Sequence, residues 1–102
     1  MIVDAENVRR SLWPNLTRDQ LVSRARDWAL RECHHLLIVF DGETPEDAPD
    51  LVSSPDADDE IVRIATTTRR PFWVATSDRE LRRRLGEGPE RVIGGGTFVR
   101  LL

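Results

Sequence analysis

An unusual number of carboxylates gathers in one short stretch of the chain. SPDADDEI, residues 54–61, carries Asp56, Asp58, Asp59 and Glu60 directly ahead of an apolar helical pattern. A helix start uses one or two acids, as an N-cap and as charge that complements the helix dipole. Oxygen ligands are also what Mg²⁺ and Mn²⁺ prefer. We expect helix-start roles for Asp56 and Glu60 and a metal-binding role for Asp58, and leave Asp59 open between the two.

Other acids follow apolar runs that are typical of buried strands. Asp4 follows Met1–Val3, Asp41 follows Leu36–Phe40, and Asp78 follows Pro71–Thr76. In a parallel sheet, ligands bind outside the carboxyl ends of the strands. The helix that opens near Asp58 must begin at this same edge in order to cross back over the sheet. We therefore expect Asp4, Asp58 and Asp78 to converge, while Asp41 either joins them or makes a turn with Gly42.

Strands that alternate with helices predict an α/β fold. We expect helices over 17–33, from SPDADDEI to about 68, and from 77 to about 85, and a fourth strand over 91–93. Thr17–Gln20 and Ser77–Glu80 both fit a capping box. Residues 5–15 are expected to be a loop, 42–55 a mobile loop and 94–96 a flexible turn, with the tail either strand or helix. The prediction is one domain, 1–102, with a mostly parallel sheet of four to five strands and helices on both faces.

The bulk composition narrows the classes of function. The chain has 102 residues, a net charge of −3, and fifteen basic residues that are all arginine. The net charge alone does not indicate a nucleic-acid binder. No apolar run is long enough to span a membrane, and the N-terminus lacks a signal-peptide pattern. The one cysteine, Cys33, excludes an internal disulfide and fits a reducing cytosol, so we expect a cytoplasmic protein.

Four sequence motifs together resemble a known family. VDAENV (3–8), VFDG (39–42), ADDEIVRIA (57–65) and VATSD (74–78) occur in an order and spacing similar to the PIN-like NYN ribonuclease superfamily. The Trp13-Pro14 pair in the first loop makes the YacP-like branch the most similar. The resemblance implies a three-layer PIN-like, Rossmann-like domain that acts as an RNA endonuclease dependent on Mg²⁺ or Mn²⁺. The expected partner is RNA, either free or associated with the ribosome.

The resemblance also implies roles for individual residues. Asp4, Asp58 and Asp78 would bind metal, with Asp59 as a fourth ligand. Asn7 would act in catalysis by orienting the attacking water or by touching substrate. Ser77 would help to position the site and could cap its helix as well.

Arginine side chains are the candidates for guiding an RNA strand, because the forked guanidinium suits phosphate. Arg9 and Arg10 follow the first acidic motif, and Arg79 and Arg83 lie on the helix after Asp78. For each, an ordinary solvated surface is the alternative.

Aromatic and histidine residues have mostly structural interpretations. Trp28, Trp73 and Phe72 are expected in the core. Trp13 either packs over the sheet, which we favour, or stacks on a base. His34 and His35 begin a strand and so lie at the edge away from the acids, which argues against a catalytic role.

The first functional hypothesis is a metal-dependent endoribonuclease. The second is an RNA-binding or protein-binding module without catalysis, motivated by Ala5 and Glu6, which stand where the family usually has Gly and an aromatic residue. A phosphohydrolase or phosphoacceptor domain is the third, and the lack of any lysine to neutralise an acyl phosphate argues against it.

Overall fold

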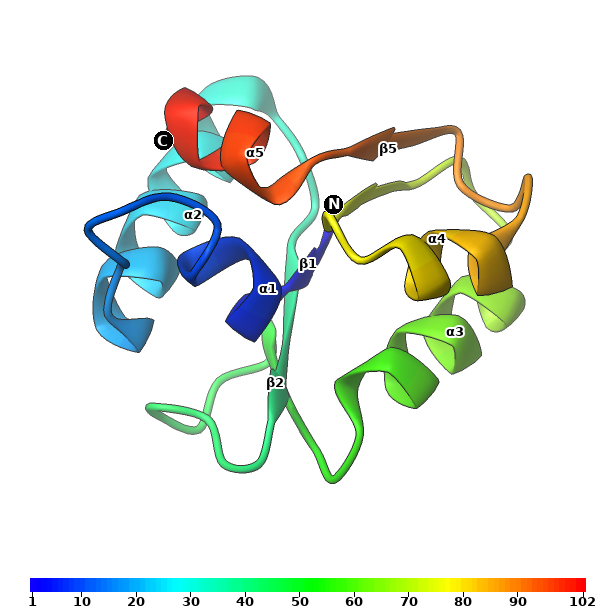
Figure 1. Cartoon of the computed structure of the whole chain (residues 1–102), viewed down its shortest axis with the longest axis horizontal. Helices are drawn as coiled ribbons and strands as arrows, with labels where there is room; N and C mark the ends of the chain where they lie inside the picture. Colours follow the sequence, from blue (N-terminus) through cyan, green and yellow to red (C-terminus); the bar gives the residue numbers. More distant parts are fainter.

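Five parallel strands form the centre of the molecule. The computed structural model describes all residues, 1–102, and the sheet has the order β3-β2-β1-β4-β5 (Figure 1). The strands are β1 (Ile2–Asp4), β2 (Leu37–Asp41), β3 (Leu51–Ser54), β4 (Trp73–Ala75) and β5 (Arg91–Ile93). Every neighbouring pair is parallel. The predicted α/β class with a parallel sheet is confirmed, and β1 is its central strand.

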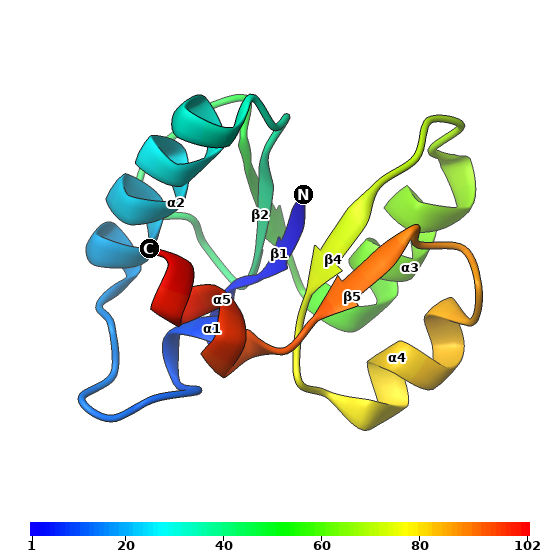
Figure 2. The same ribbon diagram turned by 90° about the horizontal axis from the view of Figure 1, so that it is seen from above.

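Helices cover both faces of this sheet. They are α1 (Ala5–Arg9), α2 (Arg18–Glu32), α3 (Ala57–Thr67), α4 (Arg79–Leu85) and α5 (Gly95–Leu101). Figure 2 shows α1, α2 and α5 on one side of the strands and α3 and α4 on the other. None of these helices is long and apolar enough to cross a membrane.

The core is divided between the two faces because successive strand side chains point in opposite directions. Val3 belongs to a cluster of 16 buried residues that includes Val8 of α1, Leu21 of α2 and Phe98 of α5. Its neighbour Ile2 belongs to a cluster of 7 buried residues with α3 and α4. This alternation fixes the register of β1 and thereby decides where its last residue, Asp4, lies.

The long helix begins and ends as the sequence predicts. The Thr17 side chain accepts a hydrogen bond from the Gln20 amide at 3.0 Å, and the Thr17 amide donates to Gln20 Oε1 at 2.9 Å. This reciprocal pair satisfies two of the amides that a helix start leaves free. Cys33 ends the helix in the left-handed conformation, with φ of 55°.

Three expected loops contain regular structure, so those predictions were wrong. The segment 5–15 begins with α1, whose Ala5 and Val8 are buried one helical turn apart. The segment 42–55 contains β3, an edge strand in which only the two end residues, Leu51 and Ser54, are buried and which lacks the long apolar run of a central strand. Gly94–Gly96 is not a flexible turn: Gly94 is the N-cap of α5, and the tail is helical.

Ion pairs hold the connection between β2 and β3 against α2. Arg26 donates to both carboxylate oxygens of Asp50 at 2.8 Å and to Glu46 at 2.7 Å. The Asp50 pKa lies below its ordinary value, chiefly because of the hydrogen bonds from Arg26. These contacts give the predicted mobile loop a defined attachment.

Candidate functional site

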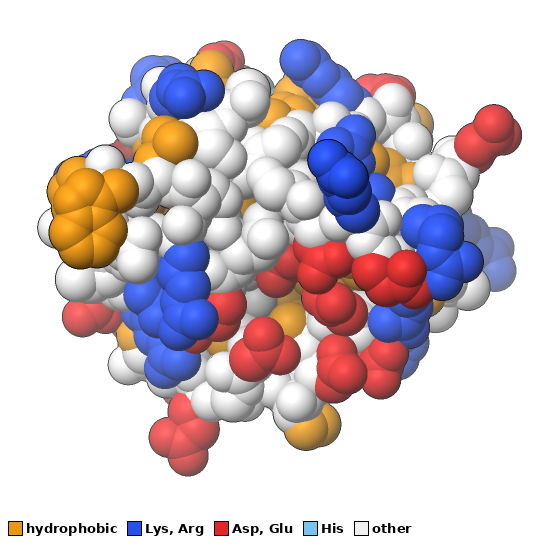
Figure 3. All heavy atoms as spheres, in the orientation of Figure 1, with side chains coloured by type: hydrophobic (Ala, Val, Ile, Leu, Met, Phe, Trp, Pro, Cys, Tyr) orange, Lys and Arg blue, Asp and Glu red, His pale blue; other side chains and the backbone are white.

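A polar cavity of about 850 Å³ opens at the carboxyl edge of the sheet. None of its lining residues is hydrophobic, and they come from every segment that follows a strand at this edge: Asp4, Glu6, Asn7, Arg10, Ser11, Asp41, Pro55, Asp56, Asp58, Ser77, Asp78, Gly94, Gly96, Thr97 and Arg100. Figure 3 shows acidic side chains gathered in this region, with basic side chains on either side. Three acids predicted to converge, Asp4, Asp58 and Asp78, all line this one cavity.

Asp4 is the most perturbed acid in the cavity. It is only 4% exposed. Burial raises its pKa to about 6; a hydrogen bond from Thr76 opposes the shift, and the negative charges of Asp58, Asp41 and Asp78 add to it. Burial also raises the pKa of Asp58, as do the charges of its acidic neighbours. The cluster therefore carries more negative charge at neutral pH than its surroundings compensate.

Thr76 is a site residue that sequence reasoning missed. Its hydroxyl donates to Asp4 Oδ2 at 2.8 Å and accepts from the Asp78 amide at 3.1 Å. Thr76 is fully buried, so this hydroxyl orients Asp4 without contact with solvent. The pairing of Val3 with Ala75 places the next residues, Asp4 and Thr76, side by side. Strand pairing was therefore the signal that could have found it.

Asn7 and Ser77 connect three segments at the floor of the cavity. Asn7 Oδ1 accepts from the Ser77 amide at 2.7 Å, and Ser77 Oγ accepts from the Gly95 amide at 2.7 Å. A side chain on Gly95 would collide with Ser11 Oγ and lie 3.1 Å from Asn7 Oδ1. The start of α5 therefore packs directly against α1 and the β4–α4 turn.

Ser77 does not cap α4, so the second predicted capping box was wrong. Asp78 is the N-cap, and its Oδ1 accepts from the Leu81 amide at 3.1 Å. Ser77 is displaced from that role because its hydroxyl is bonded to Gly95. Ser77 does line the cavity, and its positioning role stays a prediction.

Asp41 contributes to the cavity as well as to a helix start. Its Oδ1 accepts from the Ala57 amide at 2.8 Å, at the beginning of α3. It also lines the cavity and raises the pKa values of both Asp4 and Asp58. Asp41 therefore joins the other acids at the cavity, which was one of the two alternatives, the other being a turn with Gly42.

The remaining acids of SPDADDEI divide between a cap and surface ion pairs. Asp56 caps α3 by accepting from the Asp59 amide at 3.1 Å, as predicted. Asp59 does not line the cavity; its carboxylate pairs with Arg84 at 2.7 Å. Glu60 pairs with Arg63 one turn along the helix. The helix start therefore directs Asp58 inward and Asp59 outward.

The predicted RNA-binding arginines lie in different surroundings. Arg10 is exposed, lines the cavity and makes no ion pair. Arg100 of α5 does the same, although sequence reasoning missed it because the tail was not assigned to a helix. Arg9 pairs with the Glu6 carboxylate, and its guanidinium donates to the Leu16 carbonyl oxygen at 3.3 Å.

The two arginines of α4 that were predicted to bind RNA, Arg79 and Arg83, lie outside the cavity. Arg83 pairs with Glu80, which precedes it by one helical turn. Arg79 is exposed and makes no ion pair. Arg10 and Arg100 are therefore the cationic side chains that line the acidic site.

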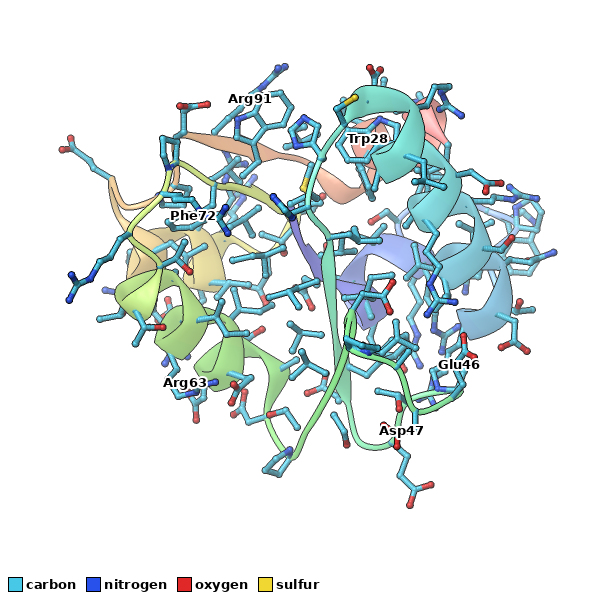
Figure 4. All side chains as sticks on the ribbon, turned by 180° about the vertical axis from the view of Figure 1, so that it is seen from behind. Trp28, Glu46, Asp47, Arg63, Phe72 and Arg91 are labelled. Atoms are coloured by element: carbon cyan, nitrogen blue, oxygen red, sulfur yellow. The ribbon has the colours of Figure 1, made fainter.

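The histidines lie away from the acidic cavity. The His34 ring lies between those of Trp28 and Trp73, at 4.8 and 4.7 Å, and Arg91 stacks on Trp73 at 5.0 Å. Figure 4 shows Trp28 and Arg91 near each other, with Trp28 on α2. Trp28 is buried as expected, whereas Trp73 is half-buried.

The donor set of the cavity has the chemistry that Mg²⁺ or Mn²⁺ requires. Asp4, Asp41, Asp58 and Asp78 supply only carboxylate oxygens, and a divalent cation would offset their mutual repulsion. As the side chains lie, no three or more His, Cys, Asp or Glu residues are grouped closely enough to hold a metal ion. The residue types fit such a cation, but metal binding requires these carboxylates to draw together.

Comparisons with protein-family models, with curated proteins and with solved structures find no match to this chain. Neither the resemblance to the NYN superfamily nor the functions it implies are therefore tested by known relatives.

Proposed function

We propose that the protein is an endoribonuclease that hydrolyses RNA phosphodiester bonds with Mg²⁺ or Mn²⁺. One observation carries the proposal: four acids from separate parts of the chain, Asp4, Asp41, Asp58 and Asp78, surround one polar cavity in which Asp4 is buried. Perturbed carboxylates in a cleft at the carboxyl edge of a parallel sheet are typical of a functional site. The choice of RNA as substrate rests on the sequence resemblance.

Asp4, Asp58 and Asp78 are the residues that would hold the metal. When bound, such an ion supplies charge stabilisation at the phosphodiester and lowers the pKa of water. Thr76 fixes the orientation of Asp4 through its hydroxyl. Because Asp41 lies near Asp4 and Asp58 and its charge raises the pKa of both, it strengthens the negative field that attracts a cation.

The other cavity residues have polar groups suited to the substrate. Since Asn7 Oδ1 is bonded to the Ser77 amide, its Nδ2 group is left as a donor for water or a phosphate oxygen. Arg10 and Arg100 have no carboxylate partner and line the same cavity. Guanidinium groups in this position would bind the phosphates that flank the scissile bond.

A second candidate is an RNA-binding or protein-binding module without catalysis. It is favoured by the spacing of the acids, which do not form a group of three ready to hold a metal ion. Glu6, at the start of α1, also stands where the NYN family usually has an aromatic residue, and it is bound by both Arg9 and Arg18. This candidate predicts binding without cleavage.

The test is cleavage of an unstructured RNA in Mg²⁺ or Mn²⁺, with and without EDTA. We expect Asp58→Asn to lower the rate at least 100-fold, and Glu60→Gln, on the same helix but outside the cavity, to retain it. Asp59→Asn decides whether the fourth predicted ligand takes part; its pairing with Arg84 predicts retained activity. The mechanism would be overturned if the wild type still cleaves RNA in EDTA and the Asp58→Asn variant cleaves it as fast as the wild type. Binding without cleavage would favour the second candidate.

A further inference from the structure

Trp13 exposes a large apolar surface that the fold does not use. Its exposed fraction is 88%, and the other large exposed apolar residues are Leu30 and Leu101, at 80% and 46%. The expectation that Trp13 packs over the sheet was wrong. Tryptophan usually buries most of its ring, in a core or against a partner. An indole left in solvent is therefore available for a ligand.

Hydrogen bonds hold Trp13 at the tip of a closed loop. The Leu16 amide donates to the Arg9 carbonyl at 2.9 Å, and the Ser11 amide donates to the Val8 carbonyl at 3.1 Å. Leu16 is buried at the base of the loop. Although Trp13 itself is exposed, the backbone that carries it is therefore attached to the core.

The loop also borders the acidic cavity. Ser11 lines the cavity, and its Cα lies within about 8 Å of the Trp13 Cα because they are two residues apart. Leu12 packs on Gly96, another lining residue: a Cβ placed there would lie 3.3 Å from Leu12 Cδ2. Figure 3, compared with Figure 1, shows an apolar side chain projecting over the α1–α2 connection, with basic side chains between it and the acidic patch.

We propose that Trp13 is a stacking platform for an unpaired base of the RNA strand whose phosphates enter the cavity. Arg10, three residues before Trp13, lines the cavity and is free to bind a phosphate, so backbone and base contacts lie next to each other along one strand. A base held in a duplex is already stacked on its neighbours and cannot offer a face to the indole. The site would therefore select single-stranded RNA over a duplex. This inference rests on the proposed function for the class of ligand.

The experiment measures binding of a labelled single-stranded RNA and of a blunt-ended duplex formed by the same strand and its complement. It is done in Mg²⁺ on the Asp58→Asn background, so that the RNA stays intact. Stacking on an aromatic side chain predicts that Trp13→Ala weakens binding of the single strand about 5- to 150-fold. We expect Trp13→Phe to restore most of the affinity, since it keeps an aromatic face. Leu30→Ala is the matched control, because Leu30 is equally exposed and lies on α2.

The outcomes separate this inference from the proposed activity. Binding that depends on Trp13, in a protein that never cleaves RNA, supports the stacking role and removes the nuclease. Cleavage by the wild type together with unchanged binding by Trp13→Ala overturns the stacking role alone. Equal affinity for the blunt-ended duplex and the single strand, or no RNA binding at all, also overturns it.

Discussion

Replacing Asp4 with Asn should stabilise the metal-free protein at neutral pH. The Asp4 pKa rises from 3.8 to about 6, first because the carboxyl is buried and then because other acids surround it. Between these values the folded protein holds more protons on Asp4 than the unfolded chain does. Stability therefore falls as the pH rises from about 3.8, and the loss is complete above about 6. Asn keeps the acceptor for Thr76 and carries no charge.

The size of the effect follows from the pKa shift. At about 1.4 kcal/mol for each pKa unit, a rise from 3.8 to about 6 corresponds to about 3 kcal/mol. For a domain of this size, 1 kcal/mol moves the melting temperature by about 4–8 °C. Asp4→Asn should therefore melt about 12–24 °C above the wild type at pH 7.5, and the two should converge near pH 4.

The assay is thermal or urea unfolding of both proteins in EDTA from pH 4 to 8. Comparing them at each pH removes the contribution of the other acids, such as Glu6 and Asp50, whose pKa values are lowered and whose stabilising effect is lost as the pH falls. Adding Mg²⁺ or Mn²⁺ at 100 times its dissociation constant should stabilise the wild type by about 2.7 kcal/mol and Asp4→Asn much less. A stability difference that is constant with pH, or an Asn variant less stable at pH 7.5, would refute the reasoning.

Two other substitutions test the packing around the cavity, and a third tests the attachment of the β2–β3 connection to α2. Gly95→Ala should lower the free energy of unfolding by about 1–3 kcal/mol in denaturant titrations, because its methyl group would collide with Ser11. Gly94→Ala is the control: its Cβ would have ordinary contacts, at 3.6 Å from Ser77 Oγ, so the free energy of unfolding should change little. Thr76→Val should cost about 1–3 kcal/mol by leaving the Asp78 amide and Asp4 without their partner, whereas Thr76→Ser should retain most of the stability in the same titrations. Arg26→Ala should speed cleavage of the 42–50 connection by a glutamate-specific protease, because Arg26 binds Asp50 and Glu46. Arg24→Ala, on the same helix but without an ion pair, should leave the cleavage rate unchanged. Equal cleavage of both variants would show that these contacts do not hold the segment.

The sequence was most informative where apolar periodicity and strand ends coincide. Asp4 is the last residue of one strand and Asp78 comes shortly after another, and a parallel sheet necessarily brings such ends to one edge. The same argument placed Asp58 at that edge, because the helix that it opens must cross the sheet. The convergence of these acids needed only the order of the elements.

Features that depend on contacts distant in sequence could not be predicted. The edge strand β3 has Ser53 exposed and Ser54 buried, so its pattern differs from that of an apolar central strand. Ser77 resembles an N-cap by spacing, yet its hydroxyl is used by Gly95 of α5. Because α5 was not assigned as a helix, Arg100 and that contact were both missed.

The strand order also has a kinetic consequence. The β2–β3 and β4–β5 pairs meet only through β1, and the hydrogen bond between Asp4 and Thr76 joins residues that are 72 positions apart. Pairings this distant lose loop-closure entropy before they gain any contact, which slows folding relative to proteins with mostly local contacts. The insertion of β1 also buries Asp4 among the other acids. The β1–β4 pairing that closes this long loop therefore also holds Asp4 near the negative charge of Asp78, so one contact between strands carries both an entropic and an electrostatic cost.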